Sequence, residues 1–163
     1  MISRVKSMIS SVSIIQAATG KQVNFCQFAR ELVEKRKLVY FGEIHSIPAI
    51  VKVQQAVLEA MTESAKQNSA KVHVFLEHFS IEDQILIDNY MNNVDSEQDL
   101  LQKYEELSSE GHDIEKYIPI FKFAKSNLST VSIRGAFIPR WCVILIFNTR
   151  LQMTVLKHSF HWL

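Results

Sequence analysis

The sequence predicts an α/β fold with a mostly parallel sheet and flanking helices. Three short apolar runs, at 38–41, 72–76 and 130–133, alternate along the chain with amphipathic segments. This alternation is typical of right-handed strand–helix–strand units. The first two runs are nearly continuous in apolar residues, as expected for strands that are buried on both faces. A chain of 163 residues, 47% of them hydrophobic, is long enough for one domain with a core.

Besides the apolar runs, the first half of the chain predicts one short edge strand and two helices. Residues 11–16 alternate weakly between apolar and polar side chains, which indicates an edge strand. Asn24 can cap a helix over residues 25–35. Pro48 suits the first turn of a second helix that reaches about Lys66. The expected apolar face of this second helix comprises Ile50, Val53, Val57, Ala60 and Met61.

The second half of the chain predicts three more helices. Ser80 and Ser96 are each followed three residues later by Asp, which is the spacing of a capping box, so a helix is expected after each of them. Another helical segment is expected from Asp113, and Pro119 marks either a kink in it or its true beginning. The apolar face expected for this last segment comprises Ile114, Tyr117, Ile118, Phe121 and Ala124.

The charge is distributed unevenly. All 17 acidic residues lie between Glu31 and Glu115. The charged residues at both ends of the chain are all basic. The Ser-rich, acid-free start resembles a mitochondrial targeting peptide, with a disordered terminus as the alternative. The two cysteines are too few for a disulfide framework and fit a reducing, intracellular compartment.

Composition argues against nucleic acid as a partner and against a transmembrane segment. Basic residues at the ends are not interleaved with aromatic ones in any known motif, so nucleic acid is not an expected partner. The longest apolar run, at 141–147, is far shorter than the roughly 18 residues that a transmembrane helix needs. No transmembrane segment is therefore predicted.

The three predicted strands all end in polar residues, and their carboxyl ends should meet at one edge of the sheet, where α/β proteins bind ligands. The strand ends are Gly42-Glu43-Ile44-His45, Glu77-His78 and Arg134-Gly135. Two carboxylates and an imidazole could bind zinc or manganese, which would activate a water molecule. Without a metal, one carboxylate could act as a base while His45 positions a substrate. A buried structural Glu–His–Arg network is the alternative.

For other polar residues, the evidence for a role at this site is weaker. Gln54 and Gln84 come early in the helices that follow the first two strands, so they could reach the strand ends. His73 lies near the start of its strand, at the opposite edge. The remaining histidines show no ligand spacing and are expected to be solvent-exposed: His112, His158 and His161.

A set of motifs resembles the ChaN-like haem-binding uptake domain over about residues 17–140. The motifs are TGK, VYFGEIH, VFLEHF, DQILIDNY, YIPIFKFAK and VSIRGAFIPR, in this order. The family is grouped with Tiki and TraB proteins and is similar to erythromycin esterase-like enzymes, whose related motifs are read as a metal-dependent hydrolase site. The resemblance divides the chain into a targeting or disordered segment at 1–16, a ChaN-like domain at 17–140 and a divergent tail at 141–163.

The resemblance implies roles for individual residues. The family motif falls on Gly42, Glu43, His45, Glu77 and Gln84, and Arg140 matches a further position. The implied catalytic residues are Glu43, His45 and Glu77, and the implied metal ligands are the same three with His78, which stands where the family commonly has Met. The implied cofactor-binding residues are Gln84, Arg134 and Arg140. Tyr104 and Tyr117 stay open as haem ligands, since Tyr is one known ligand type.

Three functions follow as expectations. The first is a haem-binding domain that takes part in iron or haem handling, with haem or another small molecule as its partner. The second is a metal-dependent hydrolase that uses Glu43, His45 and Glu77 with zinc or manganese. The third is an inactive fragment, because the tail at 141–163 would replace the family's second half and leave a shortened domain. The missing strands would then expose an apolar edge and favour a homodimer.

Overall fold

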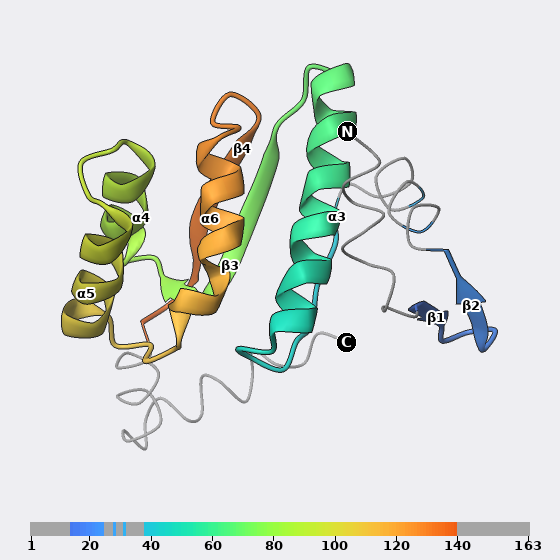
Figure 1. The fold of residues 1–163 in the computed structure, drawn as a ribbon, viewed down its shortest axis with the longest axis horizontal. Coiled ribbons are helices and arrows are strands. Elements are labelled where there is room, and N and C mark those ends of the chain that lie inside the picture. Colours follow the sequence, from blue (N-terminus) through green and yellow to red (C-terminus); the bar gives the residue numbers. More distant parts are fainter. Residues whose placement is uncertain (1–13, 25–27, 29–30, 32–37, 140–163) are drawn as a thin grey trace, which may run out of the picture. The chain divides into compact units, whose positions relative to one another are not determined.

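The structure is a computed structural model that describes residues 14–24, 28, 31 and 38–139. The chain divides into two compact units. The first unit comprises Met1–Val74 and Asp113–Ser132, and the second comprises Phe75–His112 and Ile133–Leu163. Figure 1 labels the helices and strands of both units.

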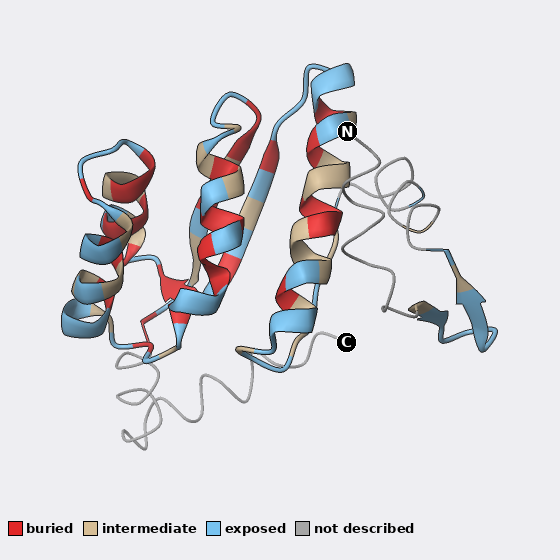
Figure 2. Cartoon of the chain, in the orientation of Figure 1, coloured by how far each residue is buried: buried red, intermediate tan, exposed pale blue. Residues whose placement is uncertain are grey.

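A small hairpin opens the described part of the first unit. Strand β1 (Ile14–Gln16) pairs antiparallel with β2 (Lys21–Val23). Gly20, with φ of 66°, takes the left-handed conformation that the turn requires. Most of the hairpin is exposed (Figure 2). The strand predicted over 11–16 is confirmed where the structure describes it, while its partner β2 was not predicted.

The core of the first unit lies between α3 and the segment that begins at Asp113. Helix α3 (Pro48–Gln67) has the predicted bounds to within one residue. The 3₁₀-helix η1 (Ile114–Tyr117) and α6 (Ile118–Lys125) pack against it (Figure 1). Pro119 lies in the first turn of α6, so the α-helix begins there and is not kinked. The five residues predicted for the apolar face of this segment are all buried.

The predicted strand at 38–41 is wrong. Residues 38–44 form neither helix nor strand, and Leu38 and Tyr40 are 65% and 89% exposed. A strand must pair its backbone N–H and C=O groups with a neighbouring strand. The sheets of the described residues are β1–β2 and β3–β4, and neither includes this segment. The apolar composition of the segment was therefore not enough to predict its conformation.

A parallel strand pair confirms the α/β class. Strand β3 (Val72–Ser80) pairs with β4 (Val131–Phe137). The N–H of Val72 donates to the carbonyl of Thr130, and the N–H of Ile81 donates to the carbonyl of Phe137, both at 2.8 Å. Because both strands advance in the same direction between these two bonds, the pair is parallel.

Both strands of this pair run further than the sequence predicted. Glu77 and His78 lie within β3 instead of following it, and Arg134 and Gly135 lie within β4. The side chains of Glu77 and Arg134 are exposed. Because the pairing of strands is a backbone interaction, polar side chains that face water do not end it.

Two helices of the second unit pack side by side, α4 (Gln84–Met91) and α5 (Glu97–Leu107) (Figure 1). The predicted capping box of Ser96 and Asp99 is formed at the start of α5. The hydroxyl of Ser96 is the main cause that lowers the pKa of the Asp99 carboxyl. Ser80 and Asp83 exchange the same pair of bonds, although a turn at 81–83 delays the start of α4 to Gln84.

Several predictions fall outside the described residues. The helix expected at 25–35 is described only at Phe28 and Glu31, which are helical. Residues 1–13, Arg140 and the tail at 141–163 lie outside the described part. Within the described part, no helix is both long and apolar enough to cross a membrane.

Gly135 provides a test of the strand pairing. A Cβ atom at Gly135 would collide with the carbonyl oxygen of Ser80 and lie 2.8 Å from its carbonyl carbon, whereas a Cβ atom at Gly42 would meet nothing within 4 Å. We expect Gly135→Ala to lower the free energy of unfolding by about 1–3 kcal/mol, since backbone must move. Gly42→Ala should stay within about 0.5 kcal/mol of the wild type. Urea denaturation compares the two variants, and equal stabilities would contradict the close approach.

Candidate functional site

The carboxylate of Glu43 is the centre of a hydrogen-bond network in the first unit. Its side chain is only 4% exposed. Oε1 accepts a hydrogen bond from the hydroxyl of Tyr117 at 2.6 Å and lies 3.1 Å from Nδ1 of His45. Oε2 accepts a hydrogen bond from the side-chain amide of Gln54 at 2.6 Å. A buried carboxylate is tolerated when donors of this kind compensate for the loss of water.

The network ties an irregular segment to two helical elements. Gln54 lies in the second turn of α3, and Tyr117 ends η1 with only 1% of its surface exposed. The hydroxyl of Tyr117 also accepts a hydrogen bond from the backbone N–H of Ser46 at 3.1 Å. Ser46 has a left-handed φ of 60°, which turns the chain just before α3 begins at Pro48. Tyr117 thus has an apolar body in the core and a polar tip at the site.

His45 is the accessible member of this network. Its side chain is 41% exposed, in contrast to the buried side chain of Glu43. Histidines that ligate metals usually share their second ring nitrogen with a carboxylate or carbonyl group, which fixes the ring orientation and raises ligand basicity. With Nδ1 beside the carboxylate, Nε2 is the ring atom suited to bind a metal. The predicted closeness of Glu43 and His45 is confirmed, although no strand carries them.

Exposed apolar side chains flank His45 in the sequence. Tyr40 is 89% exposed, Ile44 73% and Ile47 41%. Exposed apolar surface next to polar residues is a feature of ligand-binding sites. The segment 40–47 therefore combines a held imidazole with apolar surface.

The other predicted metal ligands lie in the second unit. Glu77 is exposed on β3, and His78, the next residue, is 3% exposed. Successive residues of a strand point to opposite faces, so we infer that Glu77 and His78 do not hold the same ion. The convergence of Glu77 with Glu43 and His45 stays a prediction.

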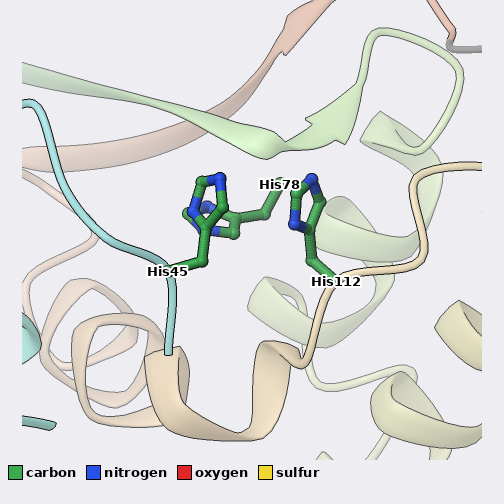
Figure 3. A group of neighbouring side chains, drawn as sticks. All are labelled: His45, His78 and His112. Atoms are coloured by element: carbon green, nitrogen blue, oxygen red, sulfur yellow. The ribbon is translucent and has the colours of Figure 1, made fainter. Parts of the chain in front are cut away.

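A second histidine accompanies His78. The rings of His78 and His112 meet edge to face, with centroids 5.0 Å apart and planes at 72° (Figure 3). His112, expected to be solvent-exposed, is half-buried. The pairing depends on Gly111, whose left-handed φ of 67° redirects the chain after α5. The sequence offers only this glycine as a signal, because His78 and His112 are too far apart to form a spacing motif.

Tyr104 of α5 links the backbones of these two histidines. Its hydroxyl donates a hydrogen bond to the carbonyl of His78 at 2.6 Å and accepts one from the N–H of His112 at 3.3 Å. Burial raises the pKa of the Tyr104 phenol above its ordinary value. Both tyrosines left open as haem ligands, Tyr104 and Tyr117, are thus buried and engaged in hydrogen bonds.

The predicted cofactor-binding residues have different surroundings. The side-chain amide of Gln84 accepts a hydrogen bond from the N–H of Gly135 at 3.0 Å and donates one to Asp88 at 2.9 Å. The bond from Gly135 fastens α4 to β4, which gives Gln84 a structural role. Arg134 is exposed on β4, and Arg140 lies outside the described residues. A cofactor-binding role for these residues stays a prediction.

Replacing Tyr117 tests the Glu43 network. Tyr117→Phe removes one donor to the buried carboxylate and the acceptor of the Ser46 N–H, so we expect the free energy of unfolding to fall by about 1–3 kcal/mol. Tyr40→Phe is the matched control, because Tyr40 is 89% exposed. It should change stability by less than about 0.5 kcal/mol. Chemical denaturation measures both, and an unchanged Tyr117→Phe would refute the network.

Comparison with known proteins identifies the family. A family model described as "Haem-binding uptake, Tiki superfamily, ChaN" matches residues 29–152 of the 163. The match begins later than the resemblance at 17–140 and continues into the tail that was expected to differ from the family. No curated protein and no solved structure matches the chain significantly. The model covers well over half of the sequence, and the chain therefore belongs to the ChaN family of haem-binding uptake proteins in the Tiki superfamily.

Proposed function

We propose that this protein binds haem and that His45 is its iron ligand. The observation that carries the proposal is the exposed imidazole of His45, held through Nδ1 by the buried carboxylate of Glu43. Haem iron is commonly ligated by a histidine whose other nitrogen is hydrogen-bonded. Membership of a family described as haem-binding supports haem as the molecule that the protein binds.

The residues around His45 suit a porphyrin. A flat apolar macrocycle needs apolar side chains near its iron ligand, and Tyr40, Ile44 and Ile47 expose such surface in the same segment. Bound haem would supply an iron centre that can exchange electrons and bind small molecules. Handling of haem or of its iron is the process in which we place the protein.

The remaining members of the network act on His45 and not on the iron. Glu43 orients the imidazole and makes it a stronger electron donor through the contact at Nδ1. Gln54 and Tyr117 hold the carboxylate in place, since each donates to one of its two oxygens. Glu43 is accordingly a positioning residue in this proposal.

Haem titration tests the iron ligand. Wild-type protein at micromolar haem should show a red-shifted Soret band, as expected for iron bound to an imidazole. His45→Ala should weaken binding at least about tenfold, and Glu43→Gln should have a smaller effect in the same direction. His73→Ala is the matched control, because His73 is also exposed but contacts Ser132, at 2.8 Å, instead of a carboxylate.

The outcomes separate the two parts of the proposal. If wild-type protein gives no Soret shift, the protein does not bind haem and the proposed function fails. If His45→Ala and His73→Ala both bind haem as the wild type does, haem binding stands and His45 is not the ligand.

A metal-dependent hydrolase is the second candidate. It is favoured by the adjacency of the Glu43 carboxylate and the His45 imidazole, 3.1 Å apart, since oxygen and nitrogen donors are those that zinc and manganese accept. Glu77 stays the predicted third residue. Against this role, both oxygens of Glu43 already accept hydrogen bonds from the protein.

Elemental analysis and ester hydrolysis test this second candidate. If the protein is a metal-dependent hydrolase, we expect about one zinc or manganese ion per chain in tag-free protein and an esterase activity that a chelator removes. We also expect His45→Ala to lose both the metal and the activity. Haem-free wild type that carries no metal and has no chelator-sensitive activity would rule this function out.

A further inference from the structure

We propose that His78 and His112 form a binding site for a borderline divalent ion such as zinc, nickel or cobalt in the second unit. No motif of the family resemblance includes His112, and the proposal is independent of the haem ligand assigned to His45. Imidazole nitrogen is a favoured ligand for these ions. Three features of the molecule support the site: the spacing of the two rings, the bonds that fix their backbones, and their difference in exposure.

The two imidazoles are close enough to share an ion. A ring nitrogen of His78 lies within 4.8 Å of one on His112. Two nitrogens bound to one tetrahedral zinc ion at about 2.0–2.1 Å stand roughly 3.3 Å apart. Side-chain rotation can close the difference of at most about 1.5 Å, because both rings turn about χ1 and χ2. The two rings are already neighbours, with centroids 5.0 Å apart.

The backbones of both histidines are fixed before any ion binds. The Tyr104 hydroxyl bonds the carbonyl of His78 and the N–H of His112 at once. Tyr104 is itself 4% exposed and packs against Phe79, with ring centroids 4.9 Å apart. One buried phenol therefore holds the strand that carries His78 near the loop that carries His112. Such support lowers the entropy that is lost when a ligand set is ordered.

His78 and His112 differ in solvent exposure in a way that suits ion binding. His78 is 3% exposed, whereas His112 is half-buried at the surface of the second unit. An ion can therefore reach the pair from the side of His112, while the buried ring of His78 gives it a partly dry environment. Two protein ligands leave the other coordination positions to water or to an external donor. We therefore expect a dissociation constant in the micromolar range, weaker than that of a structural metal site.

Cobalt titration of the full-length, tag-free, haem-free chain tests the site. His158 and His161 lie outside the described residues, so every protein compared should carry His158→Gln and His161→Gln. In this background we expect one Co²⁺ per chain, with visible d–d absorption. We expect His112→Gln to weaken binding at least about tenfold. Competition with Zn²⁺ should remove the cobalt spectrum.

Two further variants keep the test decisive. His73→Gln, on the same strand as His78 but exposed, should bind cobalt as the background protein does. His78→Asn should abolish the absorption while the circular dichroism spectrum is retained. If His78→Asn unfolds, His112→Gln alone decides, because its side chain is half-buried and easier to replace. Cobalt binding that is absent in the background protein, or equally strong in His112→Gln, would overturn the proposal.

Discussion

The buried carboxylate of Glu43 is the interaction on which the candidate site depends. A carboxylate with 4% of its side chain exposed is stable in the protein only because donors replace its water. Those donors come from three places in the sequence: His45 beside it, Gln54 in α3 and Tyr117 in η1. An irregular apolar segment is thereby given a defined position, and its one exposed imidazole is given a defined orientation.

The elements that the sequence predicted well are those that local features determine. Helices α3 and α5 have helical periodicity together with Pro48 or a Ser–Asp box at their starts. Helix α3 appears with nearly the predicted bounds, and α5 begins directly after its predicted cap, Ser96. The strand expected at 38–41 failed because pairing depends on a distant partner, which apolar composition does not reveal. The homodimer expected through exposed apolar surface stays a prediction.

The candidate site was predictable only in part, for a related reason. Glu43 and His45 are two residues apart, so their contact could be expected from the sequence alone. Tyr117 was considered as a haem ligand, yet its hydroxyl holds Glu43 from a position 74 residues further along the chain. His112 was predicted to be solvent-exposed, because its approach to His78 follows from the length of α5 and the turn at Gly111, which no local spacing reveals.

The central claim is that the imidazole of His45, and not a tyrosine, ligates the iron of haem. Electron spin-echo spectroscopy of the ferric haem complex, prepared with ¹⁵N-labelled histidine, measures this directly. The account predicts a ¹⁵N hyperfine coupling from one imidazole in the wild type, retained in Tyr117→Phe and absent in His45→Ala. A wild-type complex without imidazole coupling, or a coupling that survives in His45→Ala, would contradict it.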